Sequence, residues 1–109
     1  MPTEILMVFC TCPDSASAEM ISRALVADGA AACVNALPGV TSTYLWKGKI
    51  ETSEEILLLI KSSGKRYKEI EEIIVSLHPY ELPEIIAVSL DRGNSGYLDW
   101  VNQCTEKPT

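Results

Sequence analysis

Two long runs of strand-forming residues meet at the dipeptide Lys47-Gly48, and they constrain the fold more than any other feature of the sequence. Residues 40–46 are rich in Thr, Tyr and Trp, and residues 50–61 end in an apolar run. Two such runs joined by two residues predict a β-hairpin. The outer part of this hairpin, residues 40–55, is longer than a typical strand pair. We therefore expect it to project beyond the core of its own domain.

The tip of the hairpin carries three large side chains, Tyr44, Leu45 and Trp46. An isolated two-stranded ribbon is only marginally stable in water, and a contiguous apolar patch usually marks a site of interaction. We predict that a neighbouring subunit covers the tip and buries Trp46. The alternative is that the tip folds back onto its own sheet.

The rest of the chain alternates between strand and helix patterns. Dense apolar runs indicate buried strands, and apolar side chains that recur every three or four residues indicate helices. These patterns predict a strand at residues 5–10, a helix from Asp14 or Ser15 to Gly29, a strand opening at residues 31–34, a helix over residues 67–77, a strand at residues 85–90 and a short helix from residue 94. Pro38-Gly39 predicts a bulge or kink where the second strand enters the hairpin.

The resulting order is β-α-β-β-α-β-α. It predicts an α+β fold, a ferredoxin-like βαββαβ sandwich with an antiparallel sheet, the long protruding hairpin and an extra C-terminal helix. The length of 109 residues is typical of one domain, which we expect to span residues 1–109. In this plan two helices cover one face of the sheet. The other face needs a partner, so an oligomer is expected.

The charge and hydropathy of the chain argue against nucleic-acid and membrane partners. The net charge is -6, and the nine Lys and Arg residues gather only at Lys65, Arg66 and Lys68, which we interpret as the solvated start of a helix. No run approaches the roughly 20 apolar residues of a membrane span. The N-terminus lacks the basic and apolar segments of a signal peptide. We therefore expect a cytoplasmic protein.

Signatures of catalysis are weak. His78 is the one histidine, no serine lies in a G-x-S-x-G motif, and no glycine-rich phosphate loop is present. We therefore expect that the protein is not an enzyme. The remaining enzymatic alternative is a small hydrolase that uses His78 and Glu81.

Cysteine and histidine offer a more specific chemistry, because thiolate and imidazole are the soft or borderline donors that suit copper and zinc. Cys10 and Cys12 form a C-x-C at the end of the first strand, and His78 ends the second helix. We expect the two sulfurs to point to opposite faces of the strand, so that a single metal site uses one of them. The strand end and the helix end need not be close within one subunit, and a trimer could bring them together.

A structural interpretation of the same residues is the alternative. Free cysteines such as Cys10, Cys33 and Cys104 are usually small hydrophobic residues of a core. His78, at the end of a helix, could simply cap the last carbonyls of that helix.

Several motifs, in order along nearly the whole chain, resemble those of the CutA divalent-cation-tolerance family. They are Cys10-Thr11-x-Pro13, Ala31-Ala32-Cys33-Val34-Asn35, Pro38-Gly39, Ser42-x-Tyr44-x-Trp46-x-Gly48-Lys49, His78-Pro79-Tyr80-Glu81-x-Pro83-Glu84 and Tyr97-Leu98-x-Trp100. The resemblance implies a ferredoxin-like subunit in a tight homotrimer, with hairpins that reach across to neighbouring subunits. It also implies binding of copper(II) or similar divalent metal ions and a role in metal homeostasis.

The resemblance further implies which residues bind the metal. The family's copper ligands include the cysteine that matches Cys10 and a pair of histidines before the Pro-Tyr motif. In this chain the second histidine is present as His78, and Leu77 takes the place of the first. Animal members are linked to the anchoring of a membrane-bound esterase, which implies a protein partner. The alternative function is a trimeric signalling or scaffolding protein that binds a small molecule or a protein at clefts between subunits.

Overall fold

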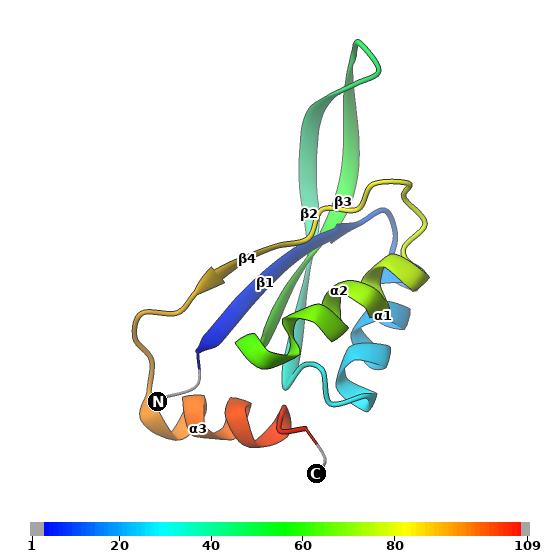
Figure 1. Cartoon of the computed structure of the whole chain (residues 1–109). Coiled ribbons are helices and arrows are strands. Elements are labelled where there is room, and N and C mark those ends of the chain that lie inside the picture. The colour runs from blue at the N-terminus through cyan, green and yellow to red at the C-terminus, as the bar shows by residue number, and fades with distance from the viewer. Residues whose placement is uncertain (1–3, 108–109) are drawn as a thin grey trace.

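The computed structural model of the chain describes residues 4–107 (Figure 1); the ends of the expected domain, residues 1–3 and 108–109, lie outside the described residues. The elements in chain order are β1 (Ile5–Cys12), α1 (Ser15–Ala27), β2 (Cys33–Trp46), β3 (Lys49–Ser63), a 3-10 turn (Gly64–Arg66), α2 (Tyr67–Leu77), β4 (Ile86–Ser89) and α3 (Ser95–Cys104). The four-stranded sheet has the order β2-β3-β1-β4, and every neighbouring pair is antiparallel. The predicted α+β fold with a βαββαβ order and an extra C-terminal helix is therefore confirmed.

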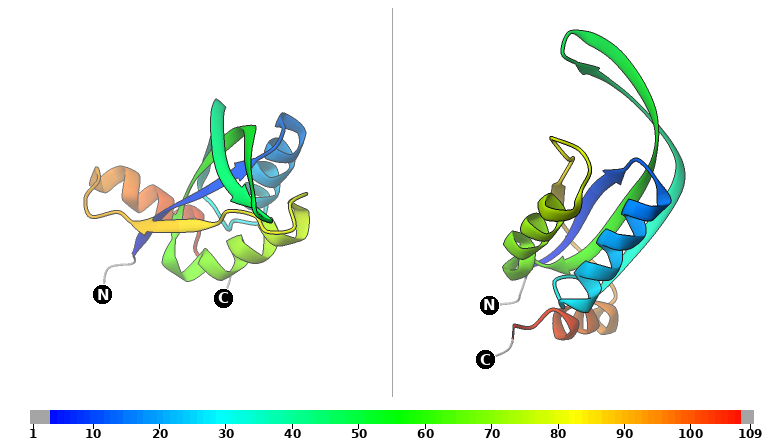
Figure 2. Two further views of the ribbon diagram at one scale, coloured as in Figure 1. Left: turned by 90° about the horizontal axis from the view of Figure 1, so that it is seen from above. Right: turned by 90° about the vertical axis from the view of Figure 1, so that its right-hand side faces the viewer.

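The core lies between one face of the sheet and the helices α1 and α2 (Figure 1). Every second residue of β1 and β3 points to this face, and the helices contribute residues four positions apart. The fully buried side chains of these elements include Val8, Cys10 and Cys12 of β1, Leu58 and Ile60 of β3, Ile21 and Leu25 of α1, and Ile70 and Ile74 of α2. Helix α3 lies at the end of the sheet remote from the hairpin (Figures 1 and 2). Within the described residues, no helix is long and apolar enough to cross a membrane.

The opposite face of the sheet, which we call the open sheet face, keeps apolar side chains in contact with solvent. Its residues are Met7, Phe9, Leu37, Leu57, Leu59, Ile86 and Val88, which the strand register places side by side. Ile86 and Val88 on the edge strand β4 are 58% and 48% exposed, and Leu37 on the other edge is 40% exposed. The expectation of a sheet with one uncovered face is therefore confirmed for the single chain.

The outer parts of β2 and β3 form the predicted hairpin, which projects past the helices and curves along its length (Figure 2). The pairing extends as far as Trp46 and Lys49. The predicted irregularity is also present, because the register shifts between Leu37 and Val40 and Gly39 has a φ of +81°. At the tip, Leu45 remains 69% exposed and Trp46 remains 37% exposed.

The turn at the tip depends on a residue without a Cβ. Lys47 and Gly48 both have positive φ, +51° and +81°, which is the backbone of a two-residue hairpin turn and favours Asn followed by Gly. We predict that Gly48→Ala destabilises the protein by about 1–2 kcal/mol, the usual cost of a left-handed L-residue. Lys47→Asn should be neutral or stabilising. Urea unfolding of the two variants measures both effects, and an unchanged stability of Gly48→Ala would contradict this account of the turn.

Candidate metal centre

Three potential metal ligands converge where the end of β1 meets the end of α2. The ligand atoms of Cys10, Cys12 and His78 all lie within 4.8 Å of one another. Both cysteines are fully buried and His78 is 8% exposed. Cys10 and His78, the two residues predicted from the sequence, are therefore brought together within one chain. The sequence left open that a trimer could bring these two ends of the fold together, but they already meet within the single chain.

Cys12 was not predicted to join Cys10, and the reason is a wrong assumption about the strand. The two sulfurs were expected on opposite faces, but side chains two residues apart in a strand point to the same face. The strand β1 continues to Cys12, because β3 pairs with it as far as Ile56. The C-x-C motif, combined with this period of two, contains the signal that would have identified Cys12.

The two sulfurs affect each other's ionisation. A hydrogen bond between them is the largest cause: it lowers the pKa of Cys12 and raises the pKa of Cys10, and burial raises the pKa of Cys10 further. Cys12 is therefore the thiol of the pair that ionises more readily. A thiolate is the form of cysteine that binds a metal ion.

His78 is held in a defined orientation by both of its ring nitrogens. Its Nε2 lies 2.7 Å from the carbonyl oxygen of Thr11, and the backbone N–H of Tyr80 donates to its Nδ1 at 3.1 Å. Because Nδ1 accepts a hydrogen bond, the ring hydrogen is on Nε2 and is donated to Thr11. A backbone carbonyl bonded to one ring nitrogen is the usual support for a histidine that binds metal through the other. The ring does not cap its own helix, as the alternative structural interpretation suggested, since its Nε2 bonds to the Thr11 carbonyl of β1.

The donor set fits a transition metal. Two thiols and one imidazole are ligands for copper and zinc rather than for calcium or magnesium, which prefer oxygen. To bind a metal, His78 must exchange one of its two ring hydrogen bonds for the metal bond. The remaining cysteines take no part in this cluster: Cys33 is half-buried and Cys104 is exposed, so neither is the fully buried core residue of the structural interpretation.

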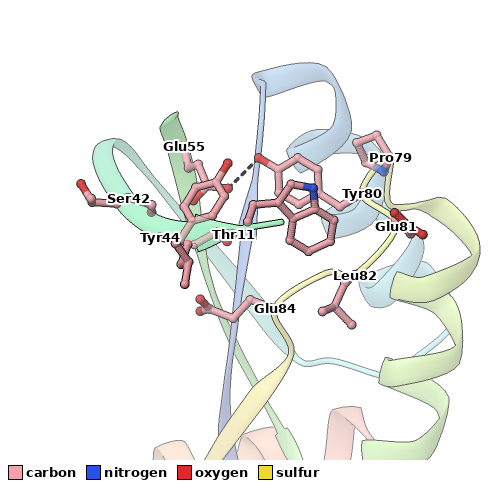
Figure 3. A pocket seen from close by; sticks show the side chains of 12 residues that line it. Thr11, Ser42, Tyr44, Glu55, Pro79, Tyr80, Glu81, Leu82 and Glu84 are labelled. Carbon is pink, nitrogen blue, oxygen red and sulfur yellow. Dashed lines mark hydrogen bonds between the residues drawn. The ribbon is translucent and has the colours of Figure 1, made fainter. Parts of the chain in front are cut away.

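A cleft of about 760 Å³ adjoins the cluster, between the outer hairpin and the loop that follows His78 (Figure 3). Its lining includes Tyr44, Trp46, Tyr80 and the carboxylates of Glu55 and Glu84. The Tyr80 hydroxyl donates to Glu55 at 2.7 Å, and burial, followed by this contact, raises the pKa of Tyr80. The hydrogen bond fixes the loop against β3 beside the cluster of Cys10, Cys12 and His78.

The two residues of the hydrolase alternative, His78 and Glu81, are not bonded to each other in the structure. The ring nitrogens of His78 bond to the Thr11 carbonyl and the Tyr80 N–H, so neither is directed at a serine or at Glu81. Glu81 is exposed and lies on the wall of the cleft. In this arrangement the lone pair of Nδ1, which a general base would use, accepts the Tyr80 N–H.

The chain is similar to proteins of one family over almost its whole length. The sequence model of the CutA1 divalent ion tolerance protein matches residues 6–104. Protein CutA of Mus musculus is 44% identical over 97% of this chain and 60% of its own length, so the chain spans about three-fifths of that relative. The divalent-cation tolerance protein CutA of Thermus thermophilus is 41% identical over 91% of this chain and 96% of its own length.

Solved structures agree with the sequence comparison. The crystal structure of CutA from Xylella fastidiosa superimposes with a TM-score of 0.92 at 49% identity, covering 94% of this chain and 98% of that one. The family identified from the sequence motifs is thereby confirmed, with a match at the level of fold as well as of sequence. The chain belongs to the CutA1 divalent ion tolerance family.

Proposed function

We propose that this protein binds copper(II) or a similar divalent metal ion through Cys10 and His78 and takes part in metal homeostasis. We further propose that it acts as a single domain over residues 1–109, in a cytoplasmic homotrimer. The observation that carries the metal role is the convergence of the two ligands in one buried cluster. The relatives' names, which refer to divalent-cation tolerance, support the same role.

The proposed chemistry is binding rather than catalysis. The thiolate of Cys10 and one ring nitrogen of His78 would bind the ion. The bound ion would not catalyse a reaction. The ring is already positioned by its bonds to Thr11 and Tyr80, so little side-chain entropy is lost when the metal binds. The affinity for the metal then depends on how easily one hydrogen bond of the His78 ring, such as that from the Tyr80 N–H, is broken.

The homotrimer is supported by two uncovered apolar surfaces in the single chain. The open sheet face and the hairpin tip both leave large side chains in water, and burial of such area is the main driving force for association. A closed ring of identical subunits satisfies the same surfaces on every copy.

The metal role is tested by titration of the wild type, Cys10→Ser and His78→Ala with Cu(II) and Zn(II) under anaerobic conditions. We expect stoichiometric binding by the wild type and a loss of at least about tenfold in affinity for each variant, because a lost ligand costs no less than a lost supporting residue. Calorimetry measures the affinity, and circular dichroism checks the fold. If both variants bind as the wild type does, Cys10 and His78 are structural.

The second candidate function is a trimeric signalling or scaffolding protein that binds a small molecule or a protein partner. The observation that favours it is the cleft beside Tyr80, which combines aromatic side chains with buried and exposed carboxylates. Pockets of this size accommodate small organic molecules. The metal titration separates the two functions. The metal-binding function requires that the protein binds metal at a low concentration of free metal ion, whereas the signalling or scaffolding function does not.

A further inference from the structure

The cleft between the outer hairpin and the loop after His78 is lined by acidic residues and by no basic one. Its acids are Glu55 on β3 and Glu81 and Glu84 on the loop, and no Lys, Arg or His is among the described residues that line it. Within residues 4–107, none of these three carboxylates takes part in an ion pair. A cleft lined by one sign of charge concentrates ligands of the opposite sign. The ligand that this cleft favours is therefore a cation.

Glu55 is the acid whose surroundings point most directly to a bound ligand. It is 6% exposed, whereas Glu81 and Glu84 are exposed. A carboxylate accepts about four hydrogen bonds, and its burial is costly unless partners compensate for it. Within the part of the chain that the structure describes, the Glu55 side chain accepts a single hydrogen bond, from the Tyr80 hydroxyl to its Oε2. Its Oε1 is thus left to accept a donor from a molecule in the cleft.

The walls of the cleft are aromatic. Figure 3 shows the ring of Tyr44 on the side of the hairpin and the ring of Tyr80 on the side of the loop, and Trp46 also lines the cleft. The faces of aromatic rings attract organic cations. One such contact is already present at the hairpin tip, where the ammonium of Lys47 lies 5.7 Å from the centroid of the Trp46 ring. Because aromatic carbon is no ligand for Mg(II) or Ca(II), these walls favour an organic cation over an inorganic one.

We propose that this cleft binds an aliphatic diamine or polyamine. Its ammonium groups would donate hydrogen bonds to Glu55 and to the exposed acids of the loop, and its carbon chain would lie against Tyr44 and Tyr80. A ligand with two or more positive charges balances more of the three carboxylates than a monoamine does. The volume of about 760 Å³ leaves room for a carbon chain between the charges, since small-molecule sites span roughly 300–1,000 Å³. This inference rests on the second candidate function, because it names the class of small molecule that the same cleft would bind.

The test is calorimetry of the full, metal-free protein with putrescine, the diamine with a chain of four carbons. Butylamine lacks the second charge, butanediol has the same length without charge, and Mg(II) has the same charge without a carbon chain. We expect putrescine to bind at least about tenfold more tightly than butylamine, because a hydrogen bond between charged groups contributes roughly this factor. Neither butanediol nor Mg(II) should displace it.

Three variants show whether putrescine binds in the cleft. Glu55→Gln keeps an oxygen for the Tyr80 hydroxyl but removes the charge, so we expect a loss of about tenfold or more in affinity. Tyr44→Leu removes one aromatic face and should lose roughly two- to fivefold. Glu72→Gln is the matched control, because it removes the same charge from an exposed residue of α2 outside the cleft, and it should bind as the wild type does. Circular dichroism checks the fold of each variant.

The inference is overturned if putrescine does not bind, if Mg(II) displaces it, if Tyr44→Leu binds it as the wild type does, or if Glu55→Gln weakens binding no more than Glu72→Gln. In the last case the attraction is only to the net charge of -6. If butanediol binds instead and Tyr44→Leu weakens it, the amine class is wrong and the second candidate function stands. If no probe binds, the small-molecule form of that function fails as well. The metal function is decided separately, by the copper titration of Cys10→Ser and His78→Ala.

Discussion

Ile86→Glu should convert the assembled protein into a folded monomer, whereas Val75→Glu should leave its assembly unchanged. Ile86 lies on the open sheet face and Val75 on the outer side of α2, and each is 58% exposed in the single chain. A glutamate is therefore tolerated at both positions by the fold of one subunit. Only the glutamate at position 86 would have its charge buried, because the open sheet face is the proposed contact between subunits.

The expected size of this effect follows from the cost of an unpaired buried charge, which is about 3–5 kcal/mol. In a closed ring every subunit contributes one copy of the contact, so every copy carries this cost. The affinity of each contact should therefore fall by roughly 100-fold or more. Light scattering on a sizing column should give three times the 11.9 kDa chain mass for the wild type and for Val75→Glu. It should give a single chain for Ile86→Glu.

Two results would contradict the proposed assembly. If the wild type elutes as a monomer at micromolar concentration, the proposal of a trimer is wrong. An Ile86→Glu protein that remains trimeric places the contact elsewhere than the open sheet face. Far-ultraviolet circular dichroism of Ile86→Glu is the control that shows whether the variant is still folded.

Much of this fold could be predicted because local patterns and long-range packing agree. The four-residue spacing of Ile70 and Ile74 indicated α2, and both side chains are fully buried in the core. The Lys47-Gly48 turn fixed the position of the hairpin, since positive φ at both residues is what a two-residue connection requires. The edge strand β4 is shorter than the predicted 85–90, because only four of its residues pair with β1.

The site could be predicted only in part, because it depends on contacts between distant segments. Cys10 and His78 were predicted as metal ligands, but nothing local in the sequence places the end of α2 against the end of β1. That contact arises when α2 packs on the sheet and its last turn brings His78 to the Thr11 carbonyl. The cleft depends in the same way on the curvature of the hairpin and on the Tyr80–Glu55 bond, and neither has a local signature.

The packing of α2 that positions His78 is tested by two neighbouring residues of this helix. Ile74 is fully buried and Val75 is 58% exposed, and the carbonyl of Ile74 accepts the backbone N–H of His78 at 2.8 Å. Ile74→Ala should lower the free energy of unfolding by about 2–5 kcal/mol, because it removes buried methylene groups and leaves a cavity.

Val75→Ala is the matched control, and its effect should stay within about 0.5 kcal/mol. Both changes replace a β-branched residue by alanine in the same helix, so the gain in helix propensity is similar and cancels in the comparison. Urea unfolding of the metal-free proteins at one protein concentration measures the difference, because assembly makes apparent stability depend on concentration. If the two variants are equally stable, α2 is not anchored through Ile74. The position of His78 beside Cys10 would then need another cause.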